Sequence, residues 1–179
     1  MEPKVLLTKR KIEKLATEYG FKSDIIEDEQ LDNKKFEVFV SHSSRDVEFI
    51  RKVVFFLKKD KGVNGVYVDW QDPSMRHETN AQTAENLKER IKNVRKVIYV
   101  VTSESLKSVW CSWEIGYADC SKGVDDVAIL AIKPNNGRWK NQEYLQQYPW
   151  ISYDLEERHF MVTRLDGNRS TLYDWLRKN

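Results

Sequence analysis

The order of apolar and polar residues along the chain predicts alternating strands and helices. Short apolar runs rich in β-branched and aromatic residues predict buried strands at residues 36–40, 66–70, 97–101 and 127–132. Between these runs, apolar residues recur every three or four positions, which predicts helices with one buried face. The pattern therefore predicts an α/β fold, with a parallel sheet covered by helices on both faces.

The predicted helices carry start and stop signals. Ser43 and Asp46 have the spacing of a capping box at the start of the first of them. Ser108 is placed to cap a later helix that runs to about Cys120, with Gly123 just beyond its end. The apolar positions of the helices after the first and second strands are Val47, Ile50, Val54 and Leu57, and Ala84, Leu87, Ile91 and Val94.

The first 34 residues are predicted to be an extension that precedes the domain at residues 35–179. One helix is expected in it, followed by an acidic linker over residues 23–32. The apolar face of that helix consists of Ile12, Leu15, Ala16 and Tyr19, with Gly20 as the stop signal.

The last part of the chain has a weaker pattern. Residues 150–153 and 160–165 are predicted to be strands, and Ser170 is expected to cap a final helix that ends at Lys178. Earlier in the chain, residues 71–80 form a polar segment that predicts an exposed loop.

Length and composition fit one globular domain. The 179 residues are 40% hydrophobic and 12% aromatic, which is too apolar for a disordered chain and sufficient for a sizeable core. A formal net charge of +2 does not indicate a broad cationic surface for nucleic acid. No apolar run is long enough to cross a bilayer or to form a signal peptide. Cys111 and Cys120 are nine residues apart on one predicted helix, which does not suit a disulfide, so we expect reduced thiols and a cytoplasmic location. No cluster of cysteine and histidine residues has the spacing of a metal site, so no metal is expected.

Polar residues follow the strands at the edge where an open parallel sheet binds ligands. Ser41, His42 and Ser43 follow the first strand, and Trp70 ends the second. The chain has no Gly-x-Gly-x-x-Gly motif or P-loop, so phosphates are expected to meet backbone N–H groups near Ser43. Each residue has an alternative local role: Ser43 as a helix cap, His42 as a local hydrogen-bonding residue rather than a base, and Trp70 as a core residue rather than a stacking surface.

Glu114 is the carboxylate with the most unusual neighbours. It stands four residues after Trp110 in the predicted helix, so the two share one helical face. An aromatic wall partly desolvates an acid and raises its pKa, which suits sugar or proton chemistry. A half-buried helix with one charge reaching solvent fits the same pattern. Cys111 is interpreted as a packed thiol, because no histidine lies at a suitable spacing to activate it.

Two segments resemble the hallmark boxes of the Toll/interleukin receptor (TIR) domain. The first, residues 36–46, runs from a hydrophobic strand into Ser-His-Ser and then an acidic residue. The second resembles the Ser-x-x-Ser-x-Trp-Cys-x-x-Glu box, and its matched positions are Ser105, Ser108, Trp110, Cys111 and Glu114. The resemblance spans about residues 36–132 and implies a flavodoxin-like open parallel sheet.

The resemblance also implies an activity. In family members that cleave NAD+, the glutamate of the second box is catalytic, and Glu114 holds that position here. The expected reaction converts NAD+, as substrate rather than cofactor, into nicotinamide and ADP-ribose or a cyclic ADP-ribose signal. The residues expected to bind the substrate are Ser41, His42, Ser43, Trp70 and Trp110.

The expected partners follow from the same resemblance. A small TIR domain with a short extension is similar to the bacterial immune members of the family. This similarity implies a role in antiphage defence, self-assembly with other TIR protomers, and a separate effector that the nucleotide product activates. No nucleic acid or membrane partner is expected.

Three alternatives stay open. A non-catalytic TIR scaffold would only assemble with other TIR domains. Residues 113–118 are also similar to nucleoside deoxyribosyltransferases, although the usual Gly-Thr before the glutamate helix is missing. A phosphoreceiver is suggested by Asp69 and Lys133, but Ser41 and His42 stand where that family has paired acids.

Overall fold

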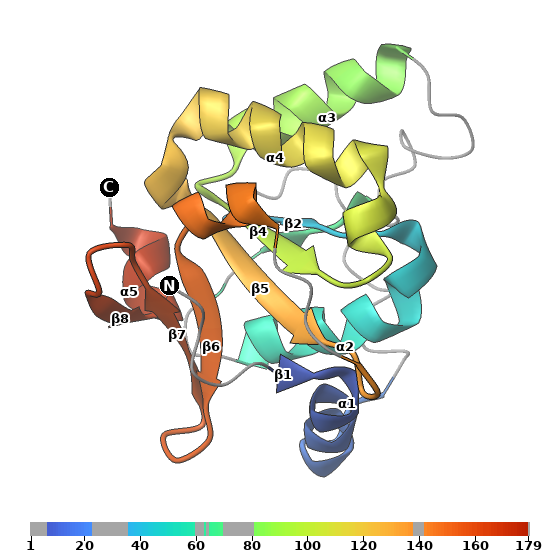
Figure 1. Cartoon of the computed structure of the whole chain (residues 1–179), viewed down its shortest axis with the longest axis vertical. Helices are drawn as coiled ribbons and strands as arrows, with labels where there is room; N and C mark the ends of the chain where they lie inside the picture. Colours follow the sequence, from blue (N-terminus) through green and yellow to red (C-terminus); the bar gives the residue numbers. More distant parts are fainter. Residues whose placement is uncertain are drawn as a thin grey trace.

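The computed structural model describes residues 7–22, 36–59, 63, 65–69, 81–137 and 142–178. Its centre is a sheet with the strand order β3-β2-β4-β5-β6-β7-β8, and β1 pairs with β5 (Figure 1). Strands β3 to β6 are parallel, whereas β7 and β8 continue the sheet antiparallel. The strands are β1 Leu7–Thr8, β2 Val38–Ser41, β3 Val66–Tyr67, β4 Lys96–Val101, β5 Val127–Lys133, β6 Trp150–Asp154, β7 His159–Thr163 and β8 Arg169–Thr171.

Helices cover both faces of the sheet, with α3 and α4 on one side and α1 and α2 on the other (Figure 1). The order of the parallel strands from β3 to β6 is the doubly wound order of flavodoxin-like folds. The predicted fold class is therefore confirmed. The helices are α1 Lys9–Glu18, α2 Val47–Lys59, α3 Ala81–Asn93, α4 Val109–Lys122 and α5 Leu172–Arg177, and short 3-10 helices occupy Ser44–Asp46, Ser105–Lys107, Val124–Asp126 and Glu143–Gln147.

Strand β4 shows why the central strands are continuous apolar runs. Val97, Tyr99 and Val101 pack on the side of α3 and α4. Ile98 and Val100 point to the opposite face, where they pack with residues of α1, α2 and α5. Since both faces are covered, every position of the strand is buried, and alternation of polar and apolar residues is lost.

Most helix boundaries agree with the sequence signals. The Ser108 side chain accepts a hydrogen bond from the Cys111 N–H at 3.3 Å and caps α4. Gly123 ends this helix with a φ of 92°, a backbone conformation that favours glycine. In α1, the predicted apolar positions Ile12, Leu15 and Ala16 are buried. The N-terminal helix and the Glu114 helix are thus confirmed.

The predicted capping box at Ser43 and Asp46 is wrong. Ser43 does cap the 3-10 turn, because its hydroxyl accepts the Arg45 N–H at 3.3 Å. The Asp46 carboxylate, however, is buried and bonds to Lys9 and Thr102 instead of turning back to Ser43. Two tertiary partners therefore outweigh the local cap.

Other parts of the secondary structure also differ from the prediction. Strand β2 begins at Val38 rather than at residue 36, and β7 ends at Thr163 rather than at residue 165. Strand β3 ends at Tyr67, and Trp70 lies outside the described residues. The final helix is capped by Thr171 rather than Ser170, because the Thr171 hydroxyl accepts the Asp174 N–H at 3.0 Å. The cap residue and the two residues before it form β8, which the sequence did not indicate. The three residues of β8 form a strand because they pair with β7, and this pairing cannot be recognised from their own sequence.

The N-terminal helix is part of the same hydrophobic core as the sheet. Strand β1 pairs with the end of β5 at Ile132 and Lys133. Leu15 and Ala16 of α1 lie in the core group that includes α2 and α5. The predicted acidic linker at residues 23–32 lies outside the described residues.

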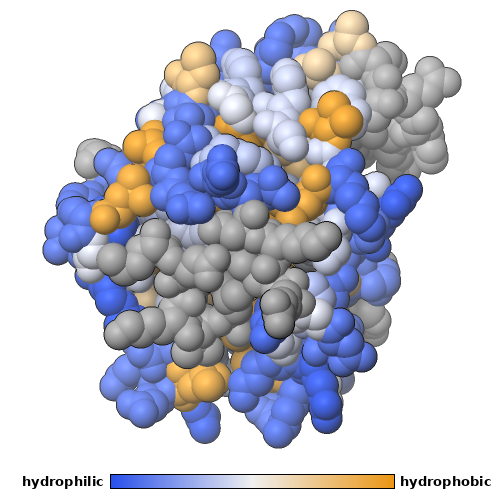
Figure 2. All heavy atoms as spheres, viewed as in Figure 1, coloured by the Kyte–Doolittle hydropathy of each residue, from blue (hydrophilic) through white to orange (hydrophobic). Residues whose placement is uncertain are grey.

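The surface in Figure 2 is mostly hydrophilic, with scattered apolar side chains. Val109, at the start of α4, is 82% exposed, and Leu155 and Leu165 are about half exposed. Among the described residues, no helix has both the length and the apolar character needed to cross a membrane.

Candidate active site

Glu114 and Ser41 meet at the carboxyl end of the parallel sheet. Ser41 is the last residue of β2, and Glu114 lies in the second turn of α4. The Ser41 hydroxyl donates a hydrogen bond to Glu114 Oε2 at 2.6 Å. Both residues are buried, with Ser41 1% and Glu114 6% exposed. The fold thus brings the acid of the second sequence box onto the strand end of the first.

Burial dominates the electrostatics of Glu114. It raises the pKa of this carboxyl from 4.5 to about 8, because the charged form is poorly solvated. The hydrogen bond from Ser41 opposes this shift, and the negative charge of Asp69 adds to it. The acid is therefore poised to change its ionisation near neutral pH, a property that often marks functional carboxyl groups.

Cys111 lies one turn before Glu114 and is a packed thiol, as the sequence indicated. It is 1% exposed and belongs to the core between the sheet and α4. Burial, followed by the nearby Glu114 charge, raises the pKa of the thiol to about 12. A nucleophilic thiolate needs the opposite shift, so Cys111 is unsuited to covalent catalysis.

His42 is held by Val40 in β2 and by Asp69, which lies two residues beyond β3. Its Nδ1 lies 2.9 Å from the carbonyl oxygen of Val40, and its Nε2 lies 3.3 Å from Asp69 Oδ1. Its side chain is 2% exposed, whereas that of Asp69 is 40% exposed. The two contacts favour the local hydrogen-bonding role that the sequence left open. They also attach the segment beyond β3 to the end of β2.

Ser43 and Trp110 are two further predicted substrate-binding residues, and they lie in different elements. Ser43 is buried at the start of the turn that leads into α2. Trp110 is partly buried in α4 and contacts Trp113 edge to face, with ring centroids 5.6 Å apart. Trp113 in turn stacks on Tyr117 at 5.7 Å, which extends an aromatic row along α4. Trp70, the remaining predicted substrate-binding residue, lies outside the described residues.

Asp46, Thr102 and Lys9 form a polar cluster beside the candidate site that the sequence reasoning missed. Lys9 Nζ lies 2.5 Å from Asp46 Oδ1, and the Thr102 hydroxyl donates to Asp46 Oδ2. A signal was present in the sequence. Asp46 directly precedes α2 and stands four and seven residues before Ile50 and Val53, so it is in line with the buried face of that helix. An acid at that position needs buried partners.

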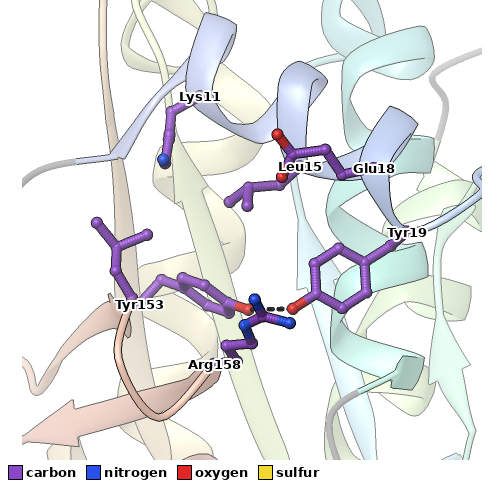
Figure 3. A pocket seen from close by; sticks show the side chains of 7 residues that line it. Lys11, Leu15, Glu18, Tyr19, Tyr153 and Arg158 are labelled. Carbon is purple, nitrogen blue, oxygen red and sulfur yellow. Dashed lines mark hydrogen bonds between the residues drawn. The ribbon is translucent and has the colours of Figure 1, made fainter.

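A separate hollow of about 380 Å³ lies between α1 and the turn that joins β6 and β7 (Figure 3). There the hydroxyl groups of Tyr19 and Tyr153 face each other at 3.5 Å. Its lining combines the cations Lys11 and Arg158 with the carboxylate of Glu18. These charges are mixed in sign and do not define a ligand class. The hollow contains none of the predicted site residues.

The fold and the site together define a class of protein: a doubly wound α/β domain with a buried glutamate facing the end of its first core strand. Comparison with known families is consistent with this class. The family model of the TIR domain matches residues 38–164. The chain belongs to the TIR domain family. The match also extends beyond residue 132, where the resemblance of the sequence boxes ended.

Two curated bacterial proteins are similar to the chain. The probable 3' cyclic ADP-D-ribose synthase ThsB' of Bacillus cereus (strain MSX-D12) is 33% identical over 125 residues, which cover 67% of this chain and 62% of that protein. The putative cyclic ADP-D-ribose synthase TIR2 of Cytobacillus dafuensis is 33% identical over 97 residues, covering 52% and 25%. The matched segments therefore span less than two thirds of either relative.

A solved structure is also similar to the chain. It is the TIR domain of the Toll-related receptor TRR-2 from Hydra magnipapillata, with 20% sequence identity and a TM-score of 0.46. The similarity covers 62% of this chain and 78% of the receptor domain.

Proposed function

We propose that the protein is a TIR-type enzyme that cleaves NAD+ to nicotinamide and ADP-ribose or a cyclic ADP-ribose signal, with Glu114 as its catalytic residue. The observation that carries this proposal is the buried Glu114 carboxylate bonded to Ser41 at the ligand-binding edge of the sheet. The names of the two bacterial relatives, both cyclic ADP-D-ribose synthases, support a product of this kind. A scaffold that only assembles has no need for an acid whose ionisation in the core is costly.

The chemistry follows from the charges of NAD+. Its nicotinamide ring is cationic, so the ring leaves with the electron pair of the N-glycosidic bond and needs no general acid. Positive charge then develops on the ribose carbon, and an ionised Glu114 next to it stabilises that charge. Water or a hydroxyl group of the same molecule completes the reaction by attacking the carbon and releasing a proton. The choice between these nucleophiles decides between ADP-ribose and a cyclic product.

Substrate binding and the ionisation of Glu114 reinforce each other in this scheme. In the free protein, burial keeps the carboxyl largely protonated at neutral pH, because its pKa is about 8. A bound nicotinamide cation favours the charged form and lowers this pKa. Ser41 keeps its hydroxyl directed at the carboxylate and stabilises the same form.

The pH dependence of the reaction is a direct test of this scheme. Since the ionised acid is the active form and its pKa in the free protein is about 8, kcat/KM is expected to rise about tenfold per pH unit below that value and then level off. Ser41→Ala removes the bond that lowers the pKa and is expected to move the midpoint to higher pH. Initial rates across the pH range, corrected for uncatalysed loss of NAD+, measure both effects. A flat profile would argue against an ionising Glu114.

The choice of substrate separates the proposal from its alternatives. Purified protein incubated with NAD+ is expected to release nicotinamide, with the second product identified by mass spectrometry. Deoxynucleosides such as deoxyinosine are expected to remain intact. Base exchange between deoxynucleosides with NAD+ untouched would instead indicate a deoxyribosyltransferase. If neither substrate reacts over a wide range of protein concentration, the non-catalytic scaffold is the better description.

The proposal includes partners. TIR domains associate with one another, and we expect assembly of several protomers to accompany activity. We propose residues 71–80, which the sequence predicts to be an exposed polar loop, as a contact segment for such assembly; they lie outside the described residues. From the similarity to the bacterial immune members of the TIR family, we propose a cytoplasmic role in antiphage defence, in which a separate effector responds to the nucleotide product.

A further inference from the structure

The buried carboxylate of Asp46 joins three segments that are distant in the sequence. Lys9 in α1 lies 37 residues before it, and Thr102, after β4, lies 56 residues beyond it. Each carboxylate oxygen has one of these partners, Oδ1 the ammonium group and Oδ2 the hydroxyl group. The Asp46 side chain is 2% exposed, so water does little to stabilise its charge. Lys9 therefore supplies the counter-charge for a buried acid.

Two segments carry the candidate active site: residues 41–43 at the end of β2, and residues 102–114 from the end of β4 to Glu114. Asp46 is directly attached to the first of these segments. Its backbone N–H donates to the carbonyl oxygen of Ser43 at 2.9 Å. Ser43 follows two residues after Ser41, which donates to Glu114. A shift of Asp46 would therefore move the turn that places Ser41 against the acid.

Thr102 attaches Asp46 to the second segment. While its hydroxyl donates to Asp46, the same oxygen accepts the N–H groups of Glu104 at 3.2 Å and Ser105 at 3.0 Å. The carbonyl oxygen of Ser105 accepts the N–H of Ser108, the residue that caps α4. The turn that begins the Glu114 helix thus depends on the orientation of the Thr102 hydroxyl, which Asp46 fixes.

The backbone of Lys9 is fixed by its neighbours before the side chain reaches Asp46. Thr8 pairs with Lys133 at the end of β5. On the other side of Lys9, the Arg10 N–H donates to Asn135 Oδ1 at 3.0 Å. Because the first turn of α1 is held at both sides, only the torsions of the Lys9 side chain remain to be ordered when its ammonium group reaches Asp46.

We infer that Lys9 is a positioning residue for Glu114, and that α1 belongs to the catalytic unit rather than to a detached extension. The Lys9 ammonium balances Asp46, and Asp46 holds both segments that carry the candidate site. Without this cation, the buried carboxylate has no counter-charge and is expected to turn toward solvent, so the Thr102 turn loosens. The activity readout of this inference rests on the proposed function, whereas its structural readout does not.

The test replaces Lys9 with methionine, which keeps most of the apolar stem and removes the charge. Lys9→Met is expected to lower kcat for NAD+ cleavage about tenfold and to change KM less than about twofold, because the acid is misplaced while the binding surface remains. Amide hydrogen exchange at residues 102–108 is expected to become faster. The matched control is Lys14→Met on the same helix, where the side chain is 70% exposed and lies 3.7 Å from Glu18. Neither readout should change in the control.

A second variant separates positioning from general destabilisation. Lys9→Met combined with Asp46→Asn removes the uncompensated charge and keeps an oxygen that accepts from Thr102. This double variant is expected to recover kcat to within about threefold of the wild type and to restore slow exchange at residues 102–108. Lys9→Arg, which retains the cation, is expected to stay close to the wild type.

The outcomes distinguish the inference from the proposed function. Wild-type kcat and exchange in Lys9→Met would overturn the inference, and so would a loss that the double variant fails to repair. If Lys9→Met does not fold, recovery of folding and slow exchange in the double variant supports the inference, and its failure to fold refutes it. If the wild-type protein leaves NAD+ intact, the proposed function fails, and the exchange measurement alone decides the role of Lys9.

Discussion

Replacing Glu114 with glutamine is expected to lower the rate of nicotinamide release from NAD+ at least about a hundredfold. Glutamine has nearly the same shape and keeps an oxygen that accepts from Ser41, so the substitution removes the charge and little else. The charge is what the reaction requires, because a positive ribose carbon develops as nicotinamide leaves. Nicotinamide release measured by chromatography at saturating NAD+ tests the expected loss.

The matched control is Glu89→Gln on the neighbouring helix α3. Glu89 is an exposed carboxylate, so the same chemical change is made away from the candidate site. Its rate should equal that of the wild type. Turnover by Glu114→Gln at the wild-type rate would refute the assignment of Glu114 as the catalytic residue. It would not refute cleavage of NAD+ by the protein.

The same substitution is expected to make the protein more stable, and increasingly so as the pH rises. The pKa of Glu114 is raised from 4.5 to about 8 in the folded protein. Below about pH 4.5 the carboxyl is protonated in both the folded and the unfolded states, so it imposes no cost. Between the two pKa values the unfolded chain releases a proton that the folded chain retains, so stability is lost as the pH rises to about 8. The full shift corresponds to at most about 5 kcal/mol of unfolding free energy.

Glutamine has no charge to bury, so Glu114→Gln avoids this loss. Its unfolding free energy should match that of the wild type near about pH 4.5 and exceed it by up to about 5 kcal/mol near about pH 8. Urea unfolding of both proteins across this pH range measures the difference, and Glu89→Gln again serves as the control. A difference that does not depend on pH would mean that burial does not raise the pKa of this acid. A buried acid that destabilises its own fold is common in active sites.

Local sequence patterns were sufficient to identify the helix that carries Glu114. Ser108 supplies the cap and Gly123 the stop, and both act through contacts within a few residues. Strands β4 and β5 were equally clear, since a strand covered on both faces must be apolar throughout. Strand β8 had no such signal, because its three residues depend on pairing with β7.

The residue composition of the site was also partly visible in the sequence. Ser41, His42 and Glu114 were selected from two short motifs, and the structure brings Ser41 and Glu114 into contact. Asp46 was misinterpreted as a local cap because its spacing from Ser43 fits one. Its actual partners are Lys9 and Thr102, and neither lies within one helical turn of it in the sequence.

By itself, the sequence determined which segments form strands and helices and which acid stands among aromatic residues, because these properties depend on neighbours a few positions apart. Only the tertiary structure decided that Glu114 is buried against Ser41, 73 residues away, and that burial moves its pKa close to neutrality. It also decided that Lys9 balances a buried acid beside the site. Desolvation and charge pairing depend on everything that surrounds a group in space, and that environment exists only once the sheet and both helix layers have assembled.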